Sequence, residues 1–195
     1  MRAFLKSCVD VVVRRRRFFV VLNLIFLWTV FASALFASFF VPPPFENEGL
    51  KGVPFLVSSN DWFAMIFVIF LFNLCLSAFA IVTLPGFVLF FLSGTMLVYR
   101  GVIWGLLLAF MPADFFVLVL PTLLLEAEAY VLAGVAGTVL GLSWLMPKRV
   151  YGNEIVSRRQ ALRMALKETL FVYFIVTLIL FSAAVVETAT IYLFI

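Results

Sequence analysis

Long apolar segments dominate this sequence and constrain its fold more than any other feature. A helix needs about 20 consecutive apolar residues to cross a bilayer. The chain is 66% hydrophobic and only 12% charged, whereas soluble domains are about half apolar and a quarter charged. We therefore expect an all-α, polytopic integral membrane helix bundle in which residues 1–195 form a single transmembrane domain. The apolar segments predict about five transmembrane helices, at residues 18–41, 62–82, 87–110, 115–145 and 170–195.

The distribution of basic residues predicts how these helices are oriented. Residues 1–17 and residues 147–167 each contain six of the chain's 14 lysines and arginines. Loops rich in lysine and arginine stay on the cytoplasmic side of a membrane. Five spans would place both basic segments on that side, with the N-terminus cytoplasmic, the C-terminus outside and residues 42–60 forming an outer loop.

Both basic segments are expected to form amphipathic helices at the membrane surface. In residues 1–17, apolar and basic positions recur at helical spacing on opposite sides, and the arm leads into the first span. Residues 147–169 show the same pattern before the last span. Such surfaces attract anionic lipid, so the bilayer is the expected partner, and we do not expect nucleic acid binding.

Proline and glycine predict where several spans end or break. Leu84-Pro85-Gly86 predicts a tight turn after the second span. Residues 115–145 are too long for one straight crossing, so we expect a break at Pro121 or around the glutamates that follow it. Residues 115–120 would then form a half-helix or a tilted approach, which is tolerated at membrane depth only where protein or water covers it.

A row of small residues follows Pro121. In a helix, Ala133, Gly137 and Gly141 recur every fourth position and therefore share one face. This spacing lets two membrane helices approach closely. We interpret these three positions as helix-packing residues, and homodimerisation through their face is a further hypothesis.

Two glutamates lie at the start of the same segment. Glu126 precedes Ala133 by seven residues and so lies on or near the small-residue face, whereas Glu128 points roughly the opposite way. Intramembrane charges are costly unless they are paired or face a polar interior. Arg100 therefore either pairs with a carboxylate, for which Glu126 is the obvious candidate, or marks a break at Gly101 beside water. A third alternative is that the Arg100 side chain extends to the lipid headgroups.

Other polar residues in the spans are candidates for an intramembrane site. Asn73 and Ser77 are four residues apart and so share a helix face. Glu187 lies in the last span between valine and threonine, where it is either solvated near an interface or a further buried acid. Glu126 either fixes helix packing through hydrogen bonds or an ion pair, or handles an ion or solute.

Recognisable enzyme chemistry is missing from the sequence. The chain contains no histidine, which removes the commonest general base and the commonest metal ligand. Cys8 and Cys75 lie in different segments without metal-ligand spacing. We therefore expect no catalytic residues, no metal or cofactor site and no enzymatic activity.

The segment from Pro121 through Gly141 resembles a known family motif. Its pattern L-P-x-x-x-x-E-x-x-A-x-x-x-A-G-x-A-G is similar to the hallmark helix of the stage II sporulation protein M family. The last span, with its V-E-T around Glu187, and Asn73 before a glycine-rich helix are similar too. The resemblance covers roughly Asp61 to the C-terminus. Glu126 matches the motif, but Thr122 and Leu123 stand where the family has a His-Gly pair.

This resemblance implies a function in assembly. In endospore-forming bacteria, members of the family are membrane scaffolds that localise cell-wall-degrading proteins, and relatives occur in archaea and in bacteria that do not sporulate. The chain is thus expected to be a non-enzymatic, multi-pass protein of the cell membrane that anchors an unidentified membrane or envelope protein. The alternative is a small transporter or channel that uses Glu126 and Arg100.

Overall fold

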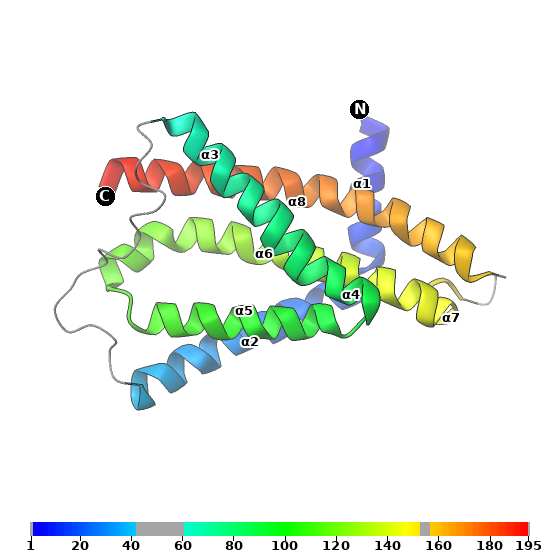
Figure 1. The fold of residues 1–195 in the computed structure, drawn as a ribbon, viewed down its shortest axis with the longest axis horizontal. Coiled ribbons are helices and arrows are strands. Elements are labelled where there is room, and N and C mark those ends of the chain that lie inside the picture. Colours follow the sequence, from blue (N-terminus) through cyan, green and yellow to red (C-terminus); the bar gives the residue numbers. More distant parts are fainter. Residues whose placement is uncertain (1, 42–60, 153–156, 195) are drawn as a thin grey trace.

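The computed structural model describes residues 2–41, 61–152 and 157–194, and these are helices joined by short turns (Figure 1). The loop expected at residues 42–60 lies outside the described residues. In chain order the elements are α1 (Arg2–Arg14), α2 (Arg16–Phe40), α3 (Trp62–Leu71), the π-helix η1 (Phe72–Thr83), α4 (Leu84–Val88), α5 (Leu92–Ala109), α6 (Ala113–Leu145), α7 (Pro147–Tyr151) and α8 (Arg158–Phe194).

Within the described part of the chain, five helical stretches are long and apolar enough to cross a membrane. In Figure 1, α5, α6 and α8 run roughly along one direction, whereas α3, η1 and α4 form one continuous stretch that crosses them obliquely. The expectation of an all-α, polytopic bundle with about five spans is therefore confirmed. The five stretches are Arg16–Phe40, Trp62–Val88, Leu92–Ala109, Ala113–Leu145 and Arg158–Leu193.

The core of the bundle is built around α6. Residues 129–143 of this helix are all buried, and α6 packs against α8, η1, α4, α5 and α2. Alanine and glycine on several of its faces allow this many neighbours to approach. In contrast, α2 exposes large side chains such as Trp28 and Phe39 along its length. Such side chains suit contact with lipid, because lipid tails are as apolar as the side chains.

The second span begins with a capped turn and continues further than the sequence predicted. The carboxylate of Asp61 accepts hydrogen bonds from the backbone N–H groups of Phe63 and Ala64, which satisfies two of the free donors at a helix start. The predicted turn at residues 84–86 is wrong, because the helix runs on to Val88. Pro85 lies where η1 passes directly into α4, so it removes one backbone donor without ending the helix.

The break predicted in the fourth span is also absent, and so is the break at Gly101 that was one alternative for the third span. The third span is α5, which begins at Leu92 and continues through Arg100 and Gly101. Helix α6 is continuous through Pro121, so the half-helix predicted at residues 115–120 does not form. Pro121 removes one backbone donor but is exposed, and a continuous helix keeps the remaining backbone groups hydrogen-bonded in an apolar surrounding.

The basic segment before the last span differs from its prediction as well. A separate amphipathic helix over residues 147–169 is not present. Instead, the short α7 is followed by α8, which runs without a break from residues 158 to 194. Residues 153–156 lie outside the described residues. The basic N-terminal arm does form a helix, α1, which packs against α8.

Candidate functional site

A cluster of polar side chains lies between α6, η1 and α5. The buried carboxylate of Glu126 accepts a hydrogen bond from Nδ2 of Asn73 at 2.6 Å. The hydroxyl of Tyr130 lies 3.2 Å from the second carboxylate oxygen of Glu126 and 2.9 Å from Oδ1 of Asn73. Ser77 also hydrogen-bonds to Tyr130. We call Glu126, Asn73, Ser77, Tyr130 and Arg100 the Glu126 cluster.

Local helix geometry brings these residues together. Tyr130 follows Glu126 by four residues in α6, so the two side chains share a face. Asn73 and Ser77 lie in η1, whose buried positions recur every four or five residues, as the wider i→i+5 bonding of a π-helix favours. Because π-helical turns are rare and occur often at functional sites, this segment marks the cluster as the candidate site.

Arg100 enters the cluster through the ring of Tyr130. Its guanidinium carbon lies 3.9 Å from the ring centre, which is a close cation–π contact. The direct pairing with Glu126 considered from the sequence does not form, since the ion pairs within the described chain involve Glu168. Arg100 and Glu126 still interact electrostatically across Tyr130. The Nε atom of Arg100 is buried without a hydrogen-bond partner.

Glu128 points away from this cluster, as its position two residues after Glu126 predicts. Its carboxylate is exposed and accepts a hydrogen bond at 3.1 Å from Nδ2 of Asn23 in α2. This contact links α6 to α2, and it gives Asn23 the interhelical role expected for a polar residue inside a span.

Glu187 approaches the cluster from α8. It is partly buried, and its carboxyl group is close enough to Glu126 for an electrostatic interaction. Two threonines in the same helix pair, Thr122 of α6 and Thr188 of α8, are buried with hydroxyl groups that have no hydrogen-bond partner. The last span therefore contributes a partly buried acid near the Glu126 cluster.

The small residues of α6 pack against other helices of the same chain. A Cβ atom added to Gly137 would meet the backbone oxygen of Thr83 at 2.8 Å and the hydroxyl of Ser93. One added to Gly141 would overlap the backbone oxygen of Gly86. Ala133 is fully buried. The face expected to support a homodimer is thus occupied by η1, α4 and α5, and a dimer would need another surface.

A hydroxyl pair strengthens this contact. The hydroxyl of Thr83 donates to the backbone oxygen of Ala133 at 2.9 Å and lies 2.6 Å from the hydroxyl of Tyr173. Three segments, η1, α6 and α8, therefore meet at one point within the bundle. Side-chain hydrogen bonds between membrane helices are worth about 0.6 kcal/mol each on average, so contacts of this kind add to the packing without replacing it.

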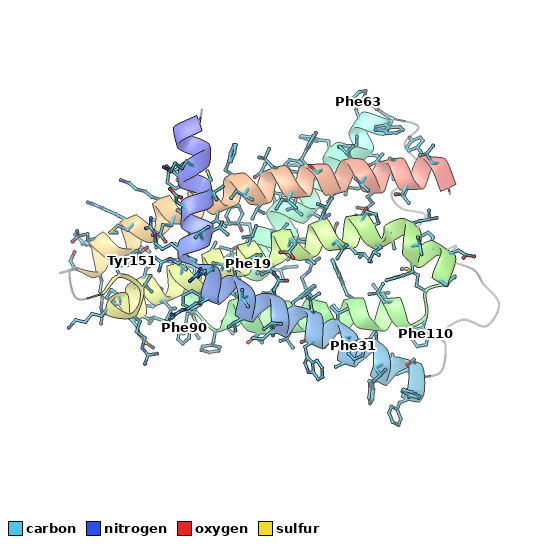
Figure 2. The ribbon with its side chains drawn as sticks, turned by 180° about the vertical axis from the view of Figure 1, so that it is seen from behind. Phe19, Phe31, Phe63, Phe90, Phe110 and Tyr151 are labelled. Atoms are coloured by element: carbon cyan, nitrogen blue, oxygen red, sulfur yellow. The ribbon has the colours of Figure 1, made fainter. Side chains whose placement is uncertain are left out.

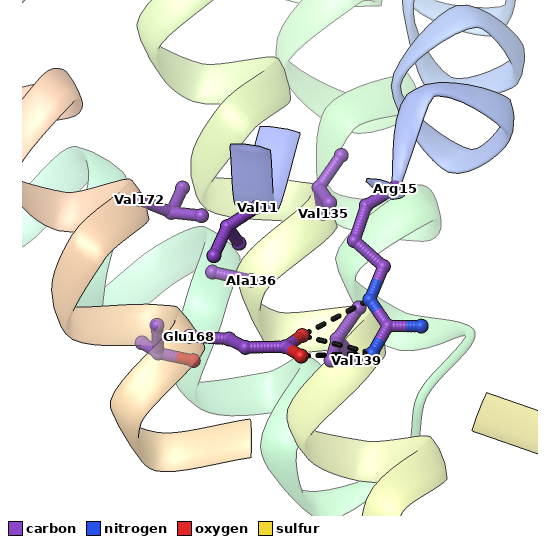
Figure 3. A pocket seen from close by; sticks show the side chains of 8 residues that line it. Val11, Arg15, Val135, Ala136, Val139, Glu168 and Val172 are labelled. Atoms are coloured by element: carbon purple, nitrogen blue, oxygen red, sulfur yellow. Dashed lines mark hydrogen bonds and ion pairs between the residues drawn. The ribbon is translucent and has the colours of Figure 1, made fainter. Parts of the chain in front are cut away.

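A second polar contact, which the sequence did not indicate, joins the N-terminal part of the chain to the first turns of α8. Arg15, between α1 and α2, donates from Nε at 3.0 Å and from Nη2 at 2.8 Å to the buried carboxylate of Glu168 (Figure 3). Its Nη1 donates to the backbone oxygen of Val150 at 3.0 Å, and Arg14 also reaches Glu168 at 3.2 Å. We call this contact the Arg15–Glu168 clamp.

The surroundings of the clamp are tightly packed. The guanidinium carbon of Arg15 lies 5.0 Å from the ring centre of Tyr151. Burial, with the Glu168 carboxylate adding to it, raises the pKa of Tyr151 to about 12, so its hydroxyl is neutral at physiological pH. The cavity beside the clamp measures about 10 Å³, which is room for roughly one water. This geometry suits a structural junction better than a ligand site.

Sequence reasoning missed three of these residues for different reasons. The four-residue spacing of Glu126 and Tyr130 could have identified the tyrosine, because i and i+4 share a helix face. No comparable signal exists for Arg15 and Glu168, which are 153 positions apart. Their pairing depends on where α1 crosses α8.

Comparisons with known proteins place the chain in a family. No curated protein and no solved structure matches this sequence. The family model for stage II sporulation protein M matches residues 18–190, which is nearly all of the 195-residue chain. This match includes α2 through most of α8, and with them the whole Glu126 cluster. The chain therefore belongs to the stage II sporulation protein M family.

Proposed function

We propose that this chain is a non-enzymatic membrane scaffold that anchors a partner protein in the cell membrane. The observation that carries the proposal is the way its intramembrane charges are engaged. Glu126 is held by Asn73 and Tyr130, and Arg100 contacts the Tyr130 ring. These groups face one another inside the bundle, so their contacts fix how helices pack, which is the role a scaffold requires.

The continuous helices support the same proposal. A transporter commonly binds its substrate where broken helices expose backbone groups near the bilayer centre. Here α5 continues through Gly101 and α6 through Pro121. A rigid bundle leaves its outer surface for partners, and α2 offers the most apolar side chains there, including Phe31 at 59% exposure and Trp28 at 70% (Figure 2). In this proposal the two basic segments, residues 1–17 and 147–167, face the cytoplasm.

Isolation of the protein with its neighbours tests the proposal. The tagged protein is crosslinked mildly in its native membrane, purified and examined by mass spectrometry. An unrelated five-span protein with the same tag serves as the control. We expect a membrane or envelope protein in stoichiometric amount that the control does not recover. Recovery of the chain alone, as a defined oligomer, would contradict the scaffold function.

One observation favours ion or solute handling as a second candidate function. Glu187 and Glu126 interact within the α6–α8 pair, and buried hydroxyl groups of Thr122 and Thr188 lack partners in the same two helices. Intramembrane acids often mark ion pathways. Proteoliposomes test this candidate by flux measurements on the wild type, Glu126→Gln and the exposed control Glu128→Gln. Flux that only Glu126→Gln abolishes would support transport over scaffolding.

A further inference from the structure

Helix α1 runs across the direction of the five long helices. In Figure 1 it stands nearly perpendicular to α8 and α6, at the end of the bundle where α7 lies. Phe4 holds it there through edge contacts with Phe171 and Phe174, whose ring centres are 5.5 and 5.0 Å away. The Arg15–Glu168 clamp fixes its other end. A helix perpendicular to the spans lies parallel to the membrane plane.

Three sides of α1 differ in their surroundings. One side is buried against α8 and includes Cys8 and Val11. Next to it, Val9 and Val13 lie one turn apart and are 56% and 55% exposed. The remaining side carries Lys6, Asp10 and Arg14, and all three are exposed. Exposed valines beside a polar face are the pattern of a helix at a lipid interface, where one side enters the acyl chains.

The length of α8 places α1 near the membrane surface. Its 37 residues extend about 55 Å at roughly 1.5 Å per residue, whereas the hydrocarbon core is about 30 Å thick. Part of α8 must therefore project beyond the core. Its first ten residues, 158–167, contain four basic side chains and precede the contact with α1. The projecting part is thus the basic one.

Exposed cations gather around α1 at this end. Ten of the chain's 14 lysines and arginines are exposed in α1, α7 and the first turns of α2 and α8. Among the described residues of these segments, one acid is exposed, and it is Asp10. At the other end, Asp61 and Asp114 are exposed. We call the ten cations the basic end; they are Lys6, Arg14, Arg16, Arg17, Lys148, Arg149, Arg158, Arg159, Arg163 and Lys167.

We propose that the basic end is a docking surface for anionic phospholipid headgroups, with α1 lying in the headgroup region and Val9 and Val13 among the acyl chains. The positive charge of this surface favours an anionic partner. The exposed valines beside the cations favour a bilayer over a nucleic acid, because a nucleic acid has no apolar layer to receive them. Basic side chains near a membrane surface bind anionic lipids and weaken as salt screens them. This inference is independent of the scaffold function.

Lipid selectivity of the full-length protein tests the surface. The protein is reconstituted in phosphatidylcholine containing spin-labelled phosphatidylglycerol or spin-labelled phosphatidylcholine, and the fraction of label immobilised by the protein is measured. We expect several-fold preference for phosphatidylglycerol at low salt, with a decrease at high salt. The variant R16Q/R17Q/K148Q/R149Q should lose at least half of that preference. The charge-conserving control R16K/R17K/K148R/R149R should keep it.

Two results would overturn the proposal. The first is an absence of charge-dependent lipid preference, seen either as equal immobilisation of both lipids by the wild type or as an unchanged preference in a glutamine variant whose helicity matches the wild type. The second is displacement of phosphatidylglycerol by an oligonucleotide at equal phosphate concentration, which would indicate a nucleic acid surface.

The depth of α1 is an independent measurement that needs no charge variant. In a Cys75→Ser background, in which Cys8 is buried, a fluorophore is attached at Val9→Cys or at Lys6→Cys. Brominated acyl chains should quench the label at position 9 more strongly than the label at position 6. Equal quenching at both positions, or none at either, would show that α1 does not lie in the lipid with this orientation.

Discussion

The guanidinium carbon of Arg100 lies 3.9 Å from the ring centre of Tyr130, whose hydroxyl in turn contacts Glu126. One aromatic side chain thus separates the intramembrane arginine from the intramembrane acid. The ring faces the cation, and the hydroxyl faces the carboxylate. Tyr130 of α6 therefore contacts Arg100 of α5 and Asn73 of η1 as well, so three helices meet at this one side chain.

Two substitutions of Tyr130 should separate the hydrogen bonds of its hydroxyl from the cation–π contact of its ring. Tyr130→Phe keeps the ring below Arg100 but loses the hydrogen bonds to Glu126 and Asn73, so we expect it to cost about 1 kcal/mol of unfolding free energy. Tyr130→Leu also loses the cation–π contact and should cost about 2 kcal/mol more. Unfolding by SDS titration in micelles measures both. Equal costs would show that Arg100 gains nothing from the ring.

Glu126 should tolerate an amide much better than an apolar side chain. Glu126→Gln keeps an acceptor for Asn73 and offers a donor to the Tyr130 hydroxyl, so we expect a change within about 1 kcal/mol. Glu126→Leu leaves Nδ2 of Asn73 buried without its acceptor, while the contact between Tyr130 and Asn73 remains, and should cost about 1–3 kcal/mol. Glu128→Leu, at an exposed site with one bond to Asn23, is the control and should cost less than about 1 kcal/mol.

The same unfolding titration compares the three variants. If Glu126→Leu proves as stable as Glu126→Gln, the buried acid is not required for helix packing. Ion handling would then be the remaining candidate role for Glu126, and the flux comparison of Glu126→Gln with Glu128→Gln would test it.

Replacement by alanine should cost far more stability at Gly141 in the α6 core than at Gly94 in the first turn of α5. A Cβ atom at Gly141 would overlap the backbone oxygen of Gly86 and meet the backbone nitrogen of Phe90 at 2.8 Å, whereas one at Gly94 would only touch Leu22 at 3.6 Å. Gly141→Ala should therefore cost about 1–3 kcal/mol. Gly94→Ala should be neutral or stabilise the chain by up to about 1 kcal/mol.

Oligomeric state in detergent completes this comparison. Because Gly141 packs inside its own chain, sedimentation equilibrium should show the same mass for Gly141→Ala as for the wild type. A stable Gly141→Ala variant that shifts from dimer to monomer would instead place this glycine in a contact between chains.

The spans could be predicted from sequence because their cause is local. A stretch of about 20 apolar residues fixes a crossing wherever its neighbours lie, and five such stretches are present among the described residues. The turn predicted at Leu84–Gly86 and the break predicted near Pro121 were wrong, and the break at Gly101, one of three alternatives for Arg100, is absent. In an apolar surrounding, free backbone groups have no water to bind, so a continuous helix is favoured even where a proline or glycine would end it in a soluble protein.

The candidate site could be predicted only in part. Glu126, Arg100 and Asn73 stand out because polar residues inside a span are costly unless they have partners or a function. Their partners depend on helix rotation and crossing, which spacing does not encode. For this reason Arg100 and Glu126 form no direct ion pair but both contact Tyr130. The small-residue face around Gly137 packs against other helices of the same chain.

The Arg15–Glu168 clamp should control the position of α1. Glu168→Ala leaves the buried guanidinium of Arg15 without a counter-charge, and we expect a loss of about 3–5 kcal/mol. Arg14 reaches the same carboxylate, but its side chain is 58% exposed, so Arg14→Gln should cost less than about 1 kcal/mol. Because Cys8 lies on the buried side of α1 and is 1% exposed, maleimide labelling of this thiol in a Cys75→Ser background reports whether α1 stays docked.

The labelling rates of Cys8 show whether the Arg15–Glu168 clamp positions α1, or whether Glu168→Ala only destabilises the fold by leaving Arg15 unpaired. Cys8 should react slowly in the wild type and in Arg14→Gln, and much faster in Glu168→Ala. In Arg15→Met/Glu168→Leu both charges are replaced by apolar side chains, which often restores stability after removal of a buried pair. If α1 is held by its apolar contacts alone, this double variant will protect Cys8 as well as the wild type does. If the directed bonds of Arg15 to Glu168 and Val150 set the angle of α1, Cys8 will stay reactive although stability returns, and that is the result we expect.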